Sequence, residues 1–150
     1  MEAVCEKSAE PDEKEINVIW RPYEGSSQEV FLSCPIFEAL YEGTRGPGKS
    51  VSLLMDFAQF VGRGFGRHWK GIIFREEFER LDELIDTSLE FFPQIFPDAV
   101  YNKSNHIWEF GTGERLLFRY AKKKSDYWKF HGKGYPFVGW DELTSWANDE

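Results

Sequence analysis

The stretch Gly43-Thr44-Arg45-Gly46-Pro47-Gly48-Lys49-Ser50 decides how the rest of this chain is interpreted. The preceding run, residues 37–41, has the composition of a β-strand. The following residues 51–61 carry apolar side chains at three- and four-residue steps, which predicts a helix. The motif consists of Gly43, four further residues and Gly48-Lys49-Ser50. It therefore lies between a predicted strand and a predicted helix, which is the context in which a phosphate-binding loop works.

The residue types in this stretch match the needs of a triphosphate. A glycine-rich loop lets backbone N–H groups approach phosphate oxygens closely, and the start of the following helix adds the positive end of its dipole. Lys49 supplies a point charge for the β and γ phosphates, and the Ser50 hydroxyl can ligate Mg²⁺. The alternative is a plain glycine turn, which the strand-loop-helix context disfavours. We therefore expect ATP to be bound by Gly43, Thr44, Arg45, Gly46, Pro47, Gly48, Lys49 and Ser50.

A second chemical signal lies near the C-terminal end of the chain. Residues 136–140 predict a buried strand that runs directly into Asp141-Glu142. In a P-loop enzyme such a strand presents one acid to the metal ion and the next to the attacking water. We expect Asp141 to hold Mg²⁺ and Glu142 to act as general base. Strand ends are often acidic, so the interpretation depends on the phosphate loop upstream.

Gln28 and Arg45 each allow two interpretations. The amide of Gln28 can both donate and accept, so it can read the edge of adenine, although composition alone favours a solvated helix residue. Arg45 lies inside the loop, where a guanidinium could stabilise transition-state charge at the γ phosphate as a catalytic residue. It could equally be a loop cation that faces solvent.

The remaining pattern predicts an α/β sheet. Residues 70–75 predict a second buried strand, and residues 76–92 predict a helix that Pro93 and Pro97 end, with Phe78 and Leu89 in its apolar stripe. Residues 107–110 and 115–120 flank a glycine-containing turn and predict a β-hairpin. Residues 26–31 predict a short capped helix, and 122–126 a polar loop. The acid pairs Glu76-Glu77 and Asp82-Glu83 are interpreted as helix surface.

Length and charge limit the function classes. The 150 residues suffice for one domain, with residues 1–15 expected as a disordered acidic tail. No apolar run approaches the ~18 residues of a transmembrane helix. A net charge of −8 disfavours a general nucleic-acid coat but allows a motor that touches DNA locally. Lys122-Lys123-Lys124 beside Tyr127 and Trp128 is either a DNA-backbone contact or, more simply, a solvated loop.

These motifs together resemble the start of the large terminase subunit of tailed bacteriophages. The resemblance lies in Trp20-Arg21-Pro22, then Gln28, the loop with its preceding strand, Ile72-Ile73-Phe74-Arg75, and the approach to Asp141-Glu142-Leu143. It covers residues 18 to 146. It implies an ASCE-type P-loop NTPase with a mostly parallel sheet, flanked by helices and carrying the hairpin.

The resemblance also implies a function and partners. An ATP-driven motor of this family packages double-stranded DNA into a procapsid, with portal protein and small terminase subunit as partners, as a homo-oligomer in the cytoplasm of the infected bacterium and not in a membrane. By the resemblance Gln28 contacts adenine, Arg45 is linked to hydrolysis, and Glu142 is the catalytic carboxylate. The family continues with a coupling motif and a nuclease domain. We therefore expect residues 16–150 to be the N-terminal part of an ATPase domain, incomplete at its C-terminus and without the nuclease.

Two other classes of function stay open. One is a different P-loop enzyme, such as a helicase-like ATPase or a nucleotide kinase, although no acceptor-binding lid is visible in the sequence. The other is a piece that binds nucleotide or partner subunits without hydrolysing ATP.

Overall fold

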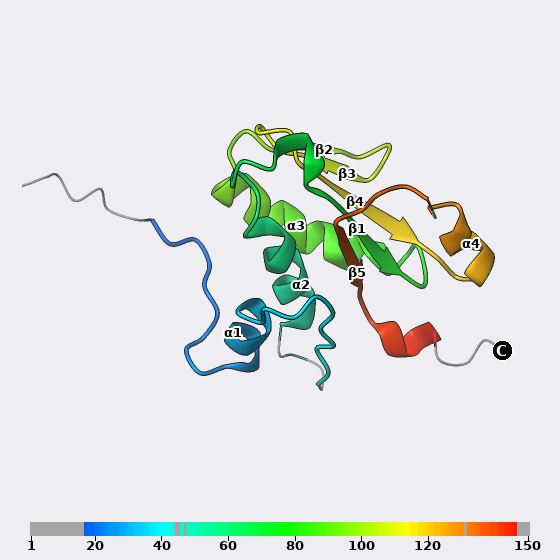
Figure 1. The fold of residues 1–150 in the computed structure, drawn as a ribbon, viewed down its shortest axis with the longest axis horizontal. Helices are drawn as coiled ribbons and strands as arrows, with labels where there is room; N and C mark the ends of the chain where they lie inside the picture. The colour runs from blue at the N-terminus through cyan, green and yellow to red at the C-terminus, as the bar shows by residue number, and fades with distance from the viewer. Residues whose placement is uncertain (1–16, 44–45, 47, 131, 147–150) are drawn as a thin grey trace, which may run out of the picture.

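The computed structural model describes residues 17–43, 46, 48–130 and 132–146, and the expected acidic tail lies outside them. The described chain is α/β, with one mixed five-stranded sheet in the order β2-β3-β4-β1-β5 (Figure 1). The strands are β1 Lys70–Arg75, β2 Val100–Asn102, β3 Ile107–Glu109, β4 Arg115–Tyr120 and β5 Phe137–Trp140. The helices are α1 Ser27–Leu32, α2 Lys49–Ala58, α3 Leu81–Ile95 and α4 Lys124–Trp128, with short 3-10 turns η1 Gly66–His68 and η2 Leu143–Trp146.

Strand β1 is the centre of the parallel part of the sheet. It pairs in parallel with β4 on one side and with β5 on the other, so that Gly71 lies opposite both Leu116 and Phe137. The predicted hairpin is confirmed as β3 and β4, which are antiparallel, and β2 adds a further antiparallel strand that the sequence interpretation missed. The sheet is therefore mixed, with parallel pairing on both sides of β1 and antiparallel pairing of β3 with its two neighbours.

Apolar side chains cover both faces of this sheet. On one face, α2 and α3 bury Leu54, Phe57 and Leu84 against Ile73. On the other face, Ile72 and Phe74 pack with Leu117 beneath the partly buried rings of Phe130, Tyr135 and Trp140. Because β1 is covered on both sides, Gly71 through Arg75 are all buried, which explains its continuous apolar sequence.

The predicted strand at residues 37–41 does not form. Phe37 is 96% exposed, and Leu40 is 75% exposed. Both edges of β1 are already paired, and only the last residue of the segment, Tyr41, is shown in contact with α1. There the Tyr41 ring stacks on Phe31 at 5.1 Å and its hydroxyl is 2.8 Å from that of Ser27. A strand needs a neighbour to complete its hydrogen-bond ladder, and local composition does not supply one.

The second predicted helix is shifted along the chain. It begins at Leu81 instead of Glu76 and continues through Pro93 to Ile95. Phe78 stays outside the helix because it packs edge-on against His106 and Tyr120, and Leu89 is 43% exposed. Pro93 lies in the last turn, where its missing N–H costs a single hydrogen bond.

Two other segments have clear outcomes. The short helix at residues 26–31 is confirmed as α1, whose Ser26 side chain accepts from the Glu29 amide. The predicted polar loop at 122–126 instead contains the start of α4. Within the described ranges, no helix has both the length and the apolar character needed to cross a membrane.

Candidate functional site

The start of α2 presents the end of the glycine-rich loop. Gly48 caps the helix in the left-handed conformation, with φ of 70°, and Lys49 is the first helical residue. The Lys49 ammonium donates to the Gly43 carbonyl at 2.8 Å, so the lysine bridges the two ends of the loop. Thr44, Arg45 and Pro47 lie outside the described residues, and the two interpretations of Arg45 therefore stay open.

Gln28 lies directly beside this loop. Its amide Nε2 donates to the Gly48 carbonyl at 3.2 Å, across 20 residues of sequence. The left-handed backbone of Gly48 favours glycine there, and a Cβ at this position would come within 2.4 Å of the same nitrogen and displace the Gln28 amide. Contact with the loop shows that Gln28 is not merely a solvated helix residue.

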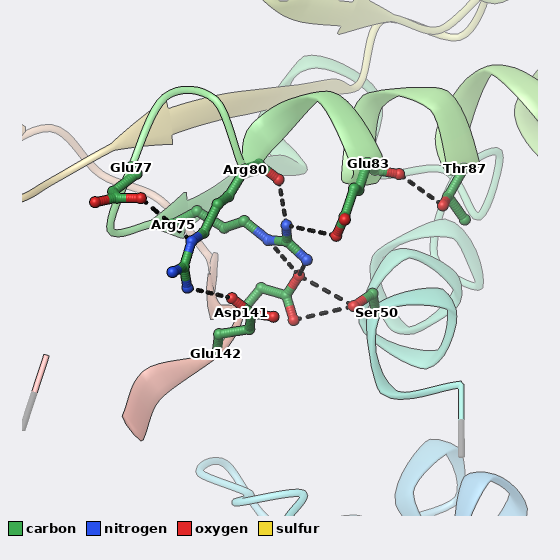
Figure 2. Close-up of polar contacts among 8 residues, drawn as sticks. All are labelled: Ser50, Arg75, Glu77, Arg80, Glu83, Thr87, Asp141 and Glu142. Carbon is green, nitrogen blue, oxygen red and sulfur yellow. Dashed lines mark hydrogen bonds and ion pairs between the residues drawn. The ribbon is translucent and has the colours of Figure 1, made fainter. Parts of the chain in front are cut away.

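The loop meets the acidic pair at Ser50. The Ser50 hydroxyl lies 3.1 Å from each carboxylate oxygen of Asp141, which is 91 residues further along the chain (Figure 2). Strand β5 delivers Asp141 to this point, and the Asp141 amide donates to the Phe74 carbonyl at 3.0 Å. Asp141 is only 5% exposed. The structure thus joins two residues that were predicted separately as metal ligands.

Arg75 is the counterion of Asp141, a role that the sequence interpretation missed. It is the last residue of β1, is buried, and contacts Asp141 Oδ2 through Nε and Nη2, both at 2.8 Å. Its Nη1 donates to the Arg80 carbonyl and lies 3.3 Å from Glu83 (Figure 2). Burial alone would lower the pKa of Arg75, but the charge and hydrogen bonds of Asp141 outweigh it and raise the pKa. An arginine at the end of a buried strand was the available sequence signal.

Glu142 points to a different arginine. Its backbone is in the left-handed region, with φ of 58°, and its Oε2 lies 3.2 Å from Arg80 Nη1. Arg80 also contacts Glu77 at 3.2 Å. The side chains of this pair are 48% and 43% exposed, in contrast to the buried Arg75–Asp141 pair.

Of the acids that were interpreted as helix surface, Glu77 and Glu83 instead form ion pairs with arginines. Glu77 precedes α3 and binds Arg80, while Glu83, although 81% exposed, binds Arg75. Both therefore belong to the ion-pair network around Asp141 and Glu142 (Figure 2). Helical periodicity could not reveal this, because the partners come from β1 and from the segment before α3.

The basic-aromatic stretch of residues 122–129 is tied into the fold. Tyr127 packs on Phe74 and Trp140 at centroid distances of 6.1 and 5.7 Å, and Lys122 lies 4.0 Å from Glu77. Neither contact indicates a DNA interface.

The oxygen atoms of Ser50 and Asp141 are suitable ligands for a hard cation. Mg²⁺ is usually held by one or two carboxylates together with phosphate oxygens of a substrate. Across the described residues, no group of three or more His, Cys, Asp and Glu side chains is arranged to hold a metal on its own.

Comparison with models of protein families, with curated proteins and with solved structures found no match to this chain.

Proposed function

We propose that this chain is the nucleotide-binding core of an ASCE-type P-loop ATPase. The observation that carries the proposal is the contact between Ser50 and Asp141. The serine that follows the loop lysine and the acid at the end of a parallel strand meet where a P-loop ATPase needs its metal ligands. Strands β1 and β5, parallel neighbours, place Arg75 and Asp141 at the same edge of the sheet.

Each residue then has a definite task. Lys49 would exchange its contact with the Gly43 carbonyl for the β and γ phosphates of ATP, and Ser50 with Asp141 would hold Mg²⁺, which neutralises charge on the phosphates. Glu142 would orient the attacking water and accept its proton. Since Arg80 contacts one Glu142 oxygen, the general base must share or release that contact to act.

The more specific proposal is the ATPase of a viral DNA-packaging motor, a large terminase subunit. Its support is the order of the resembling motifs and the hydrogen bond to the Gly48 carbonyl from Gln28, the residue proposed to contact adenine. Double-stranded DNA, the portal protein and the small terminase subunit would be its partners, and it would act as a homo-oligomer in the infected bacterial cytoplasm.

One observation favours a second candidate, a chain that binds nucleotide without turnover. Arg75 occupies an oxygen of Asp141, and Arg80 occupies one of Glu142, so both acids are paired with cations of the chain itself. A nucleotide that does not displace these contacts would bind and persist.

Thermal stabilisation by Mg-ATP tests the nucleotide site. Ligand at ~100 times its dissociation constant should add about 2.7 kcal/mol to the unfolding free energy. Lys49→Ala should abolish the shift, while Lys103→Ala, an exposed lysine in the turn between β2 and β3, should preserve it. The same absence of shift in wild type and Lys49→Ala would contradict the proposed nucleotide site.

Turnover separates the candidate functions. Glu142→Gln should keep the Mg-ATP shift and lose hydrolysis, because the amide cannot accept a proton. ATP turnover that DNA stimulates supports the packaging motor, whereas phosphate transfer to a small acceptor indicates a kinase. Binding with no turnover in the wild-type chain supports the non-catalytic candidate.

A further inference from the structure

A group of basic residues lies at the opposite end of β1 from Asp141. A cavity of about 390 Å³ is lined there by Arg67, His68, Lys70, Gly134, Tyr135 and Pro136. Lys70 begins β1 and Arg75 ends it, so five steps of about 3.3 Å separate the cavity from the acidic pair by roughly 16 Å. The cavity is therefore distinct from the glycine-rich loop.

The charge of this cavity is opposite to that of the whole chain. Three of its lining residues are basic and none is acidic, although the chain carries a net charge of −8. In the part of the chain that the structure describes, none of these three side chains forms an ion pair with a carboxylate. The neighbouring Arg115, by contrast, is neutralised by Glu109 at 2.7 Å. The positive charge of the cavity is thus available to a ligand.

The fold positions these groups at one spot. Arg67 and His68 belong to η1, and Lys70 follows after a single residue. The segment before β5 brings Tyr135 beneath Lys70, whose ammonium lies 5.4 Å from the ring centroid. A cation–π contact of this kind orients the ammonium without neutralising it.

We propose that this cavity binds phosphate groups, and that its ligand is the backbone of a nucleic acid. An arginine fork and a lysine point charge are the side chains that bind phosphate best. The walls at Arg67, His68, Gly134 and Pro136 are exposed, and a Cβ added to Gly134 would meet no atom within 4 Å. Such an open depression suits a polymer that runs past it better than a small molecule that must be enclosed. The inference does not depend on ATP binding at Lys49.

Fluorescence anisotropy of a short labelled DNA duplex, titrated with the full chain, tests the proposal. Each phosphate contact contributes a slope of about −0.9 to log affinity against log salt, so two contacts weaken binding about 12-fold between 50 and 200 mM salt. Arg67→Ala with Lys70→Ala should remove this component and bring the affinity to background. Arg21→Ala with Lys103→Ala makes the same charge change at exposed positions elsewhere and should bind as wild type does.

Further arms identify the phosphate source and separate the two sites. If inorganic phosphate at constant ionic strength displaces the duplex, the cavity takes free phosphate; if it does not, a nucleic-acid backbone is the ligand. Lys49→Ala should retain duplex binding even though it loses the Mg-ATP shift, and the Arg67, Lys70 double variant should show the converse. The proposal is overturned if wild type binds no duplex, or if both double variants lose affinity equally while their far-UV circular dichroism stays native.

Discussion

Replacing Arg75 with methionine should destabilise the fold far more than the same change at Arg80. Both arginines pair with one residue of the acidic pair, at 2.8 Å for Arg75–Asp141 and 3.2 Å for Arg80–Glu142. The side chains of the first pair are 4% and 6% exposed, those of the second 48% and 43%. The two variants therefore compare the loss of a buried arginine–carboxylate ion pair with the loss of a solvent-exposed one.

The expected magnitudes follow from what each change leaves behind. Arg75→Met leaves a buried carboxylate that keeps its contact with the Ser50 hydroxyl but loses its counterion, and removing one partner of a buried pair costs about 3–5 kcal/mol. Arg80→Met leaves Glu142 in water, where an exposed pair contributes about 0–1 kcal/mol. Against a total stability of about 5–15 kcal/mol, the first change is severe and the second hardly measurable.

Urea unfolding followed by tryptophan fluorescence measures both effects. With a slope of about 2 kcal/mol per molar urea, the midpoint should fall by about 1.5–2.5 M for Arg75→Met and by less than about 0.5 M for Arg80→Met. Adding Asp141→Asn to Arg75→Met removes the buried, unpaired carboxylate and should recover part of the lost unfolding free energy. Equal midpoints for the two single variants, or no recovery in the double variant, would refute the assignment of a buried, structurally required pair.

Three further changes test other parts of the structure. Glu114 is fully buried and accepts from the Gly62 amide at 3.1 Å; burial opposes ionisation, but its hydrogen bonds lower its pKa below 4.5. Its contribution is therefore present above pH ~4.5 and lost as the pH falls through the lowered value. Urea titrations at a series of pH values should show that Glu114→Gln reduces the loss of unfolding free energy at acid pH. An unchanged loss would exclude Glu114 as its source. Gly71→Ala should lower the unfolding free energy by about 1–3 kcal/mol, since its Cβ would come within 2.6 Å of the buried Phe57 ring; a change below about 0.5 kcal/mol would contradict this packing. Gln28→Ala should weaken the thermal stabilisation by ATP and leave that by GTP unchanged. The loss of a bidentate contact with adenine should make ATP binding less favourable by about 1–3 kcal/mol. Equal weakening for both nucleotides would exclude adenine recognition.

The local elements of this chain follow from its sequence wherever a segment carries its own signal. Three- and four-residue apolar spacing marked α2, and an uninterrupted apolar run marked β1 as a strand buried on both faces. Glycine-containing turn chemistry between two strand-like runs marked β3 and β4. These signals work because burial leaves its mark within the segment itself. Burial of one face gives a regular spacing of apolar residues, and burial of both faces gives an uninterrupted apolar run.

The candidate site is predictable in part for the same reason. Lys49 and Ser50 begin α2, and Asp141 and Glu142 directly follow β5. The sequence predicts both of these element ends, although the strand that it predicts before the loop does not form. The network around them is not predictable, because Arg75, Arg80 and Glu83 contact residues about sixty positions away or come from other elements. Arg75 is marked only by its place at the end of a buried strand, and nothing in the local pattern distinguishes Arg80 and Glu83 from ordinary surface charges.

The sequence by itself determined the apolar helix that begins at Lys49 and Ser50 and the buried strand at residues 70–75. Only the tertiary structure decided that the strand-like residues 37–41 form no strand, with Tyr41 against α1, while β4 and β5 occupy the two edges of β1. Only the order of the strands could place Arg75 beside Asp141, and Asp141 beside Ser50. The physical reason is that pairing partners compete for the same strand edges and the same buried charges, and that competition is resolved only when the whole chain is packed.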